Sequence, residues 1–399
     1  RMFLACGGTI GQEWLPEMSG ATLVVDALLG TGLSGPASGA ALDWIRRINT
    51  SFPHARVVAV DIPSGIPSDS PNAGGESARA DFTVTFTAPK VAHTLPPNCD
   101  AMGALIVGAI GSPPELYEDD PEIFLSLVEP GMFRHLLRPR SKAGHKGDYG
   151  HVLVIGGAEG KTGAAAMAGT AALRSGAGLV TVACSNPGHP ALAPELMTES
   201  LPGADSLAAL AMRKSVVAIG PGLGTSNAAA LLACRAYATL EAPVVVDADA
   251  LNLLASGPWP MNGGLRVLTP HPGEMSRLTG LATHTILEDR VSVARTFATQ
   301  RSAVLVLKGQ RTLIAHPDGR VWINPTGTPA MATGGSGDIL TGMLAGLLAQ
   351  FPTKPDAAVA AAVYVHGLAG ELGAGEMGEL PLTATDLLKY LPRAIDACL

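Results

Sequence analysis

A glycine-rich segment near the end of the chain contains residue types that could transfer a phosphoryl group. The sequence ATGGSGD ends at Asp338 and opens an apolar stretch that predicts a helix over residues 337–350. Gly334, Gly335 and Gly337 would leave main-chain N–H groups bare at the helix N-terminus, where these groups and the helix dipole stabilise a phosphoryl group in transfer. Asp338 could accept the proton of an attacking hydroxyl. The alternative is an aspartate that caps its own helix. The flanking glycines favour catalysis by Asp338, Gly335 and Gly337.

A second loop, with the sequence VLVLKGQRT, has residue types suited to a diphosphate. The pattern predicts a hairpin or a tight crossing between two strands. Lys308, at a strand end, could pair with a diphosphate, and Gly309 would permit close contact with the backbone. A solvent-exposed β-turn explains the same residues equally well, so the spacing leaves both interpretations open.

Further segments that follow predicted strands could bind a ligand or a metal ion. His271 lies between two prolines, and Glu274 falls in the first turn of the next helix, where it could also serve only as a partner of the helix dipole. Asp247 and Asp249 follow a buried strand and could hold Mg²⁺ through water, because that ion prefers oxygen ligands. Alternatively, Asp249 merely caps the following helix. The run GPGLG at residues 220–224 exposes backbone to a substrate.

The elements that must position these loops alternate along residues 131–399. Apolar strand-like runs separated by alanine-rich helices predict a doubly wound α/β domain with a helical C-terminal end. In such a sheet ligands bind beyond the carboxyl ends of the strands, where these loops are expected to meet. The predicted strands are residues 151–155, 179–184, 215–219, 243–247, 266–269, 304–308 and 311–315, and the predicted helices include 163–175, 227–239, 337–350, 357–373 and 385–398.

The first 115 residues show the same alternation on a smaller scale. Their pattern predicts a partial Rossmann-like α/β domain with a parallel sheet covered on both faces, from strands at 21–29, 55–61 and 81–86 and a helix at 40–48. The sequence from Gly30 to Gly35 matches the GxGxxG fingerprint of dinucleotide-binding loops, and Asp61 ends the next strand. A phosphate-contacting loop and a plain strand-to-helix turn fit this pattern equally well.

The composition argues against several classes of function. The chain has 399 residues, a net charge of −7 and 47% hydrophobic residues. This acidic balance provides no basic field for nucleic acid or anionic lipid, and no run approaches the roughly 18 apolar residues of a membrane span. The five cysteines are scattered without a CxxC pair, which argues against a disulfide framework or a zinc site and is typical of a reducing cytosol. We therefore expect a cytoplasmic protein with small-molecule ligands.

From about residue 140 onward, seven motifs resemble a known family. KGDYGHVLVIGG, GAGLV, GPGLG, DADALN, LTPHPGEM, LKGQRT and MATGGSGD occur in the order typical of the ADP-dependent NAD(P)H-hydrate dehydratases, which have a ribokinase-like fold. The resemblance implies that ADP phosphorylates the hydroxyl of (S)-NAD(P)H-hydrate and that loss of phosphate then restores NAD(P)H, leaving AMP. Members of the family commonly assemble, so we expect a homo-oligomer, and we expect ADP to act together with Mg²⁺. GGSGD alone also fits vitamin kinases such as hydroxyethylthiazole kinase, so a ribokinase-like kinase of a small vitamin alcohol is the alternative.

The same resemblance assigns ligand contacts to individual residues. Substrate contacts carry over to Ala164, Gly222 or Gly224, His271 and Asp338. Nucleotide contacts carry over to Lys308, Gly309, Gln310, Arg311, Thr312 and Gly337.

The first part of the chain resembles the later half of the NAD(P)H-hydrate epimerase domain that precedes the dehydratase in bacterial bifunctional repair proteins. VVDALLGTGLSGP and VDIPSG carry this resemblance. It implies K⁺ binding by Asp26 and Ser64, substrate contact by Asp61, and binding of the substrate phosphate by Gly30, Thr31, Gly32, Leu33, Ser34, Gly35 and Pro36. The Asn/Gly/Asp-rich phosphate loop of the family does not precede these strands here, so we expect little or no epimerisation. The predicted domains are residues 1–115 and 140–399, joined by a linker and helix at 116–139.

Overall fold

The chain folds into two compact units, Arg1–Ile123 and Phe124–Leu399. The computed structural model describes residues 2–11, 13–70, 74–118, 120, 122–257, 259 and 264–399. Within the predicted linker, helix α4 (Glu115–Glu118) belongs to the first unit and strand β5 (Leu125–Leu127) to the second. Strand β5 pairs with β14 (Val321–Ile323) and so enters the sheet of the second unit.

The first unit contains a parallel sheet whose four described strands lie in sequence order. These strands are β1 (Leu23–Asp26), β2 (Arg56–Val60), β3 (Phe82–Phe86) and β4 (Ala104–Gly108). Helix α2 (Gly39–Thr50) joins β1 to β2 and buries Ile45 and Ile48. Helix α1 (Met2–Ala5) precedes the sheet, and helix α3 (Val91–Thr94) follows β3. The predicted strands and helix are confirmed with shifted ends, and β4 is additional.

One face of this sheet is exposed, so the prediction of a sheet covered on both faces is wrong for the first unit. The register places Leu23 and Val25 on the same face as Phe82 and Ile106. These four side chains are 57%, 56%, 40% and 48% exposed. On the opposite face, α2 packs against β2. A parallel sheet buries both faces where helices cover it, but the strand sequences do not show which residues would supply that cover.

The second unit is built on a mixed sheet, and all seven predicted strands are present in it. Its described strands lie in the order β5-β14-β13-β12-β11-β10-β9-β6-β7-β8. Strand β13 is antiparallel to both neighbours, whereas the strands from β12 to β8 run parallel. Strands β5, β8 and β14 were not predicted; β5 and β14 are only three residues long, and all four residues of β8 are exposed and give no apolar signal. The remaining bounds are β6 (His151–Ile155), β7 (Leu179–Cys184), β8 (Met197–Ser200), β9 (Val216–Ile219), β10 (Val244–Val246), β11 (Arg266–Leu268), β12 (Val304–Leu307) and β13 (Leu313–Ala315).

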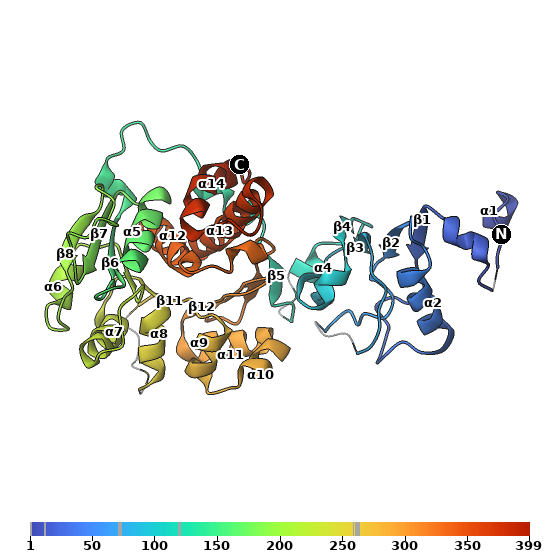
Figure 1. Cartoon of the computed structure of the whole chain (residues 1–399), viewed down its shortest axis with the longest axis horizontal. Coiled ribbons are helices and arrows are strands. Elements are labelled where there is room, and N and C mark those ends of the chain that lie inside the picture. The colour runs from blue at the N-terminus through green and yellow to red at the C-terminus, as the bar shows by residue number, and fades with distance from the viewer. Residues whose placement is uncertain are drawn as a thin grey trace. The chain divides into compact units, whose positions relative to one another are not determined.

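Helices cover both faces of this sheet (Figure 1), which confirms the doubly wound architecture predicted for the second unit. One layer packs together α5 (Thr162–Arg174), α12 (Ser336–Gln350), α13 (Pro355–Met377) and α14 (Ala384–Asp396). The other contains α7 (Asn227–Thr239), α8 (Ala248–Ala255), α9 (Pro272–Thr279), α10 (Thr283–Glu288) and α11 (Arg290–Arg301). Helix α6 (Leu207–Ala211) precedes β9.

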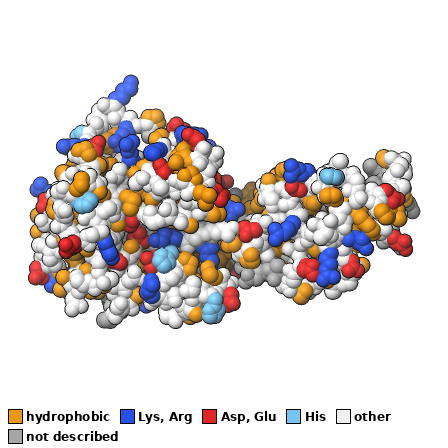
Figure 2. Space-filling view, viewed as in Figure 1, with side chains coloured by type: hydrophobic (Ala, Val, Ile, Leu, Met, Phe, Trp, Pro, Cys, Tyr) orange, Lys and Arg blue, Asp and Glu red, His pale blue; other side chains and the backbone are white. Residues whose placement is uncertain are grey.

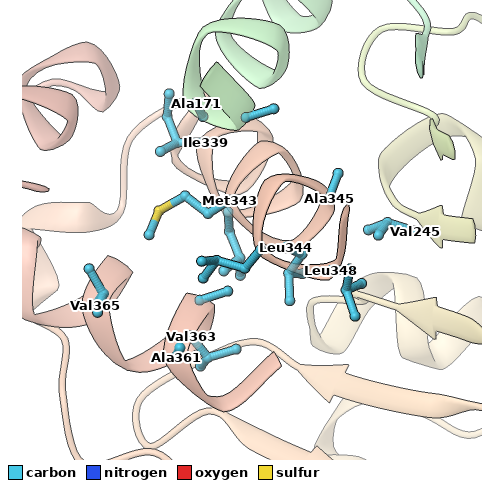
Figure 3. Packing of buried hydrophobic residues seen from close by; sticks show 14 of the residues in the cluster. Ala171, Val245, Ile339, Met343, Leu344, Ala345, Leu348, Ala361, Val363 and Val365 are labelled. Carbon is cyan, nitrogen blue, oxygen red and sulfur yellow. The ribbon is translucent and has the colours of Figure 1, made fainter. Parts of the chain in front are cut away.

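Helix α12, which carries Asp338 in its first turn, is buried on almost all sides. Among its fifteen residues, twelve are buried. Figure 3 shows its side chains packed between neighbouring elements, with Ile339, Met343, Leu344 and Leu348 lying near Ala171 of α5, Val245 of β10 and Val363 of α13. Each buried aliphatic side chain contributes roughly 1.5–3 kcal/mol. The N-terminus of α12 is therefore held in one place by the core of the unit.

Helix α13 corrects one expectation from the sequence. Among the described residues, Pro355–Met377 forms a helix long and apolar enough to cross a membrane, although no run of that kind was predicted. Its most apolar window is 67% buried inside the protein, and the helix packs against α12 and α14. These features are typical of a core helix, which passes the same test of length and composition.

The surface carries charges of both signs. Figure 2 shows Lys and Arg side chains interspersed with Asp and Glu over the visible face. This mixture agrees with the modest net charge of −7. An extended field of one sign, which would attract a polyanion at long range, is not evident on that face.

Candidate active site

The loops singled out in the sequence meet at the carboxyl ends of the parallel strands in the second unit. Asp247 follows β10, His271 follows β11, and Lys308 follows β12. Helix α12 begins beside them, because a Cβ atom built on Gly337 would lie 3.4 Å from Lys308 Nζ and 3.7 Å from Asp247 Oδ2. Segments far apart in the sequence thus share the position that ligands occupy in doubly wound sheets.

A buried ion pair joins two of these loops. Lys308 Nζ lies 2.7 Å from Asp247 Oδ1 and 3.8 Å from Glu274 Oε2. The hydroxyl of Thr341 donates a hydrogen bond of 2.8 Å to Asp247 Oδ2. Burial acts to lower the pKa of Lys308, but the carboxylates of Asp247 and Glu274 outweigh burial and raise it. The ammonium group therefore stays charged beside the start of α12.

Asp338 lies in an environment suited to a general base. Burial and then the negative charge of Asp247 raise the pKa of the Asp338 carboxyl to about 7, against the opposing effect of Lys308. The cap residue of α12 is Gly335, at φ 98°, and among the described residues no side chain caps the helix. A role for Asp338 as the cap of its own helix is therefore wrong. Its pKa near the operating pH is what general-base catalysis favours.

His271 is held in one orientation by a capping box at the start of α9. Its Nδ1 accepts hydrogen bonds from the N–H groups of Gly273 and Glu274, and Glu274 Oε2 accepts the N–H of His271. Since Nδ1 is an acceptor, the proton of the neutral ring resides on Nε2. Burial, followed by the charges of Lys308 and Arg277, lowers the pKa of His271. The ring is thus a neutral donor, and Glu274 orients it as well as complementing the helix dipole.

The predicted nucleotide loop is a hairpin between β12 and β13, which is one of the two backbone forms, hairpin or tight crossing, that the pattern predicted. Gly309 and Arg311 both have positive φ, at 145° and 55°. The hydroxyl of Thr312 donates to the Gly309 carbonyl over 3.0 Å. The N–H of Lys308 donates to the carbonyl of Pro270 over 2.8 Å, which links the hairpin to the segment that carries His271. Lys308 through Thr312 therefore form one ordered turn next to Asp247.

The predicted substrate contacts Ala164, Gly222 and Gly224 are also brought together. A Cβ atom on Gly222 would lie 3.3 Å from Ala164 Cβ, so the glycine loop after β9 passes directly over the start of α5. The N–H of Gly224 donates to Asp249 Oδ2 over 2.8 Å, and Lys161 Nζ lies 3.1 Å from the same oxygen. Helix α8 begins before Asp249, at Ala248, so the interpretation that Asp249 merely caps this helix is wrong. Asp249 instead fixes the Gly222–Gly224 loop.

In the first unit, Asp26 and Ser64 lie in contact at the carboxyl ends of β1 and β2. The hydroxyl of Ser64 donates to Asp26 Oδ1 over 2.6 Å, and its N–H donates to Oδ2 over 2.7 Å. The N–H of Leu29 donates to Ser64 Oγ, which connects the pair to the exposed Gly30–Pro36 loop. These contacts bring the predicted cation ligands and the predicted phosphate loop to one end of the sheet.

Asp61 has a partner that the sequence did not reveal. Lys90 Nζ lies 2.7 Å from Asp61 Oδ1 and donates to the hydroxyl of Thr85 over 2.7 Å. Thr85 donates in turn to Asp61 Oδ1 over 2.9 Å. Burial acts to raise the pKa of Asp61, but hydrogen bonds from Lys90 and Thr85 outweigh it and hold the pKa below its ordinary value. Asp61 is therefore an ionised carboxylate that is paired with the ammonium group of Lys90.

Two further residues near α12 escaped the sequence analysis. Thr341 follows Asp338 at helical spacing, so its position beside the site could have been inferred from that spacing. His366 lies in the middle of α13, and its Nε2 is 3.0 Å from the carbonyl of Ser336, the first residue of α12. Burial lowers the pKa of His366 to about 4, so the ring is neutral and its Nε2–H donates to that carbonyl. A lone histidine in an apolar helix gives no sequence signal for such a contact.

We expect Gly337→Ala to lower kcat roughly 10- to 100-fold, because the new methyl group would occupy the space beside Lys308 and Asp247 in which we predict the phosphoryl group to bind. Alanine favours a helix, so the fold should persist. A Gly375→Ala variant is the matched control, because Gly375 lies in α13 with open space around it. Steady-state kinetics of both variants check this. A normal kcat in Gly337→Ala would contradict the assigned anion site.

The similarity of the chain to known proteins agrees with this geometry. A family model described as NAD(P)H-hydrate dehydratase matches residues 152–393, and a model described as YjeF-related protein N-terminus matches residues 1–92. Among solved structures, the ADP/ATP-dependent NAD(P)H-hydrate dehydratase of Bacillus subtilis, co-crystallised with ATP and Mg²⁺, is 35% identical with a TM-score of 0.61. The similarity covers 68% of this chain and 98% of that protein, so it confirms the ribokinase-like fold predicted for the second unit.

Curated relatives extend the similarity across both units. A bifunctional NAD(P)H-hydrate repair enzyme Nnr of Moorella thermoacetica is 45% identical over 387 residues, which are 93% of this chain and 72% of the relative. The Nnr of Escherichia coli is 38% identical over 398 residues, 99% of this chain and 75% of the relative. The order of motifs, the arrangement of the site and these similarities agree. The chain therefore belongs to the family of bifunctional NAD(P)H-hydrate repair enzymes.

Proposed function

We propose that the second unit dehydrates (S)-NAD(P)H-hydrate to NAD(P)H with ADP as the phosphoryl donor, releasing AMP and phosphate. The observation that carries this proposal is Asp338, a carboxyl with a pKa of about 7, beside Lys308 and the N-terminus of α12. This arrangement pairs a base with a site for a phosphoryl group in transfer. The family of the chain supplies the substrate class.

The residues of the site support a reaction in two stages. Asp338 accepts the proton of the hydrate's hydroxyl as its oxygen bonds to the terminal phosphorus of ADP, and the bond from that phosphorus to the AMP oxygen breaks. Lys308 and the main-chain N–H groups at the start of α12 stabilise the charge on the moving phosphoryl group. The carbon–oxygen bond then breaks, phosphate leaves with the help of the ring nitrogen's lone pair, and loss of a ring proton restores the double bond.

The charge of the site fits a Mg²⁺–nucleotide complex. Burial is the largest cause of the raised pKa of Asp338, and the carboxylates of Asp247, Asp249 and Glu274 raise it further, against the opposing effect of Lys308. Among the residues that the structure describes, no group of three or more His, Cys, Asp or Glu side chains is arranged to hold a metal ion directly. Asp247 and Asp249 would therefore hold Mg²⁺ through water and the nucleotide phosphates. When bound, the ion neutralises phosphate charge.

The alternative is a kinase that stops at a phosphorylated vitamin alcohol. The test incubates the full chain with ADP, Mg²⁺ and hydrated NADH and follows the absorbance of reduced nicotinamide. Recovery of this absorbance with release of AMP and phosphate supports the dehydratase. If no absorbance returns while vitamin alcohols become phosphorylated, the result contradicts the dehydratase and supports the kinase.

The first unit raises a separate question, which is whether this chain also epimerises the hydrate. The relatives are named bifunctional NAD(P)H-hydrate repair enzymes, which supports a second activity beside the dehydratase. Asp26, Ser64 and the carbonyl of Leu29 gather oxygen ligands that fit a cation, so they would hold K⁺. Our expectation of little epimerisation stays a prediction. It is tested by supplying only the R epimer, and efficient repair without an added epimerase would contradict it.

A further inference from the structure

A buried arginine lies directly behind the predicted nucleotide loop. Arg290, the first residue of α11, is only 8% exposed. One of its terminal nitrogens, Nη1, donates to the carbonyl of Gln310 over 2.6 Å. The other, Nη2, lies 3.4 Å from the carbonyls of both Leu307 and Arg311. A single guanidinium thus gathers three carbonyl groups of one short turn.

Arg290 donates to neutral main-chain carbonyls and not to carboxylates. Neutral acceptors compensate a buried positive charge less than an ion pair does, so the burial of Arg290 is costly. Its Nε is buried without a hydrogen-bond partner among the described residues. Burial lowers the pKa of Arg290 to about 10, which still leaves the guanidinium charged at neutral pH. Burying a charge is unfavourable unless it is well compensated. A side chain that only filled space here could be apolar, so the position of this charge calls for a functional explanation.

The geometry of the peptide group supplies that explanation. The C=O of one residue and the N–H of the next point in opposite directions across a planar peptide. Carbonyls drawn to Arg290 from Gln310 and Arg311 therefore turn the N–H groups of Arg311 and Thr312 away from the guanidinium. The third peptide joins Leu307 to Lys308. Its carbonyl faces Arg290, and its N–H, on the opposite side, donates to the carbonyl of Pro270, next to His271. The direction away from Arg290 thus leads, for this peptide, toward the segment that carries His271.

We propose that Arg290 is a positioning residue for ADP: by holding the carbonyls of Gln310 and Arg311, it orients the N–H groups of Arg311 and Thr312 toward the nucleotide phosphates, while its contact with Leu307 anchors the end of β12. A cation at the carbonyl end of a peptide also polarises that peptide and makes its N–H a stronger donor. Gly309 allows this close packing, since a Cβ atom there would lie 3.3 Å from Arg290 Nη2. The inference deepens the proposed function and rests on it.

The same helix offers a matched control for this role. Arg295 donates from Nε to the carbonyl of Gly319 over 2.9 Å, and its guanidinium lies 3.8 Å from the centre of the Phe124 ring. Gly319 lies in the turn between β13 and β14, outside the predicted nucleotide loop. Arg295→Met removes an arginine-to-carbonyl contact from α11 without touching residues 307–312. Arg295→Met therefore shows how much the loss of an arginine-to-carbonyl contact in α11 destabilises the fold when the nucleotide loop is unchanged.

The test measures ADP affinity by titration calorimetry with Mg²⁺, and both KM values and kcat, in the full chain and its variants. Arg290→Met removes the contacts that fix the hairpin peptides, so it should weaken ADP binding roughly 10- to 100-fold, which corresponds to about 1.4–2.8 kcal/mol. The KM for the hydrate and kcat at saturating ADP should change by less than about threefold, because Arg290 acts only through the nucleotide loop. Arg290→Lys should recover part of the affinity, since it keeps the charge but cannot reach three carbonyls.

Each other outcome has a definite meaning. The role of Arg290 is overturned if Arg290→Met binds ADP as the unaltered chain does, or if Arg295→Met loses the same affinity. It is also overturned if both KM values rise together, because that pattern indicates a general loss of structure. An unaltered chain that binds no ADP would instead overturn the nucleotide role of the loop, and with it the proposed function.

Discussion

Replacement of Asp338 by asparagine should lower kcat roughly 10²- to 10⁴-fold, which is the usual contribution of a general base, while ADP still binds. Asparagine has nearly the same shape, so the start of α12 and its N–H groups stay in place. The amide cannot accept the proton of the attacking hydroxyl. Single-turnover measurements with ADP and the hydrate, together with calorimetric titration of ADP, separate the loss of chemistry from the loss of binding.

The same variant should be more stable than the unaltered protein at neutral pH. The folded-state pKa of Asp338 is about 7, above that of an unfolded aspartate, so ionisation of this carboxyl costs stability as the pH rises from about 4 to about 7. Asparagine cannot ionise and removes this cost, on the order of 1–3 kcal/mol. Thermal unfolding at pH 8 tests this. A less stable Asp338→Asn protein would mean that its inactivity reflects damage to the fold.

The raised pKa of Asp338 also predicts the pH dependence of the reaction. A base must be deprotonated, so kcat/KM for the unaltered chain should fall about tenfold per pH unit below about 7 and level off above it. Asp318→Asn is a suitable control, because Asp318 pairs with Arg320 in the turn between β13 and β14. Its pH profile should match that of the unaltered chain. Near-normal turnover of Asp338→Asn, or a rate that is flat from pH 5 to 8, would refute the assigned base.

Replacement of Lys308 by methionine should damage both folding and nucleotide binding. It leaves the Asp247 carboxylate, which is 2% exposed, without its 2.7 Å ion pair. Breaking a buried pair by removal of one partner costs about 3–5 kcal/mol. The loss of the charge should also weaken ADP binding roughly 10- to 100-fold. Chemical denaturation and calorimetric titration measure the two effects.

A double variant distinguishes the two roles of Lys308. Lys308→Met combined with Asp247→Asn removes both charges, so much of the lost stability should return while ADP binding stays weak. Lys308 also lowers the pKa of Asp338, so in the single variant the pH at which activity falls should move upward. A Lys308→Met protein with normal stability would show that the pair contributes little to the fold. An ADP affinity in Lys308→Met equal to that of the unaltered chain would show that Lys308 does not bind the nucleotide.

Most of the second unit could be predicted because its sequence signals are local. Apolar runs such as residues 151–155 and 179–184 became β6 and β7 without change of bounds. The glycines before Asp338 indicated an anion site at a helix start, and the prolines beside His271 indicated a fixed backbone. These features depend on residues adjacent in sequence, so periodicity and motif order are sufficient to read them. The weakly patterned strand β8 and the exposed sheet face of the first unit lacked such signals.

The sequence alone predicted the order of seven strands in the second unit, a hairpin or tight crossing after residue 307, and the aspartate in the first turn of α12. Only the tertiary structure decided which charged groups surround that aspartate, because Asp247, Glu274 and Lys308 come from three segments far apart in the sequence. It also decided that His366 and Arg290 support the site from behind, through main-chain carbonyls. Any residue can offer a carbonyl, so such contacts leave no mark in side-chain patterns. They arise only when helix packing brings a donor to the right peptide.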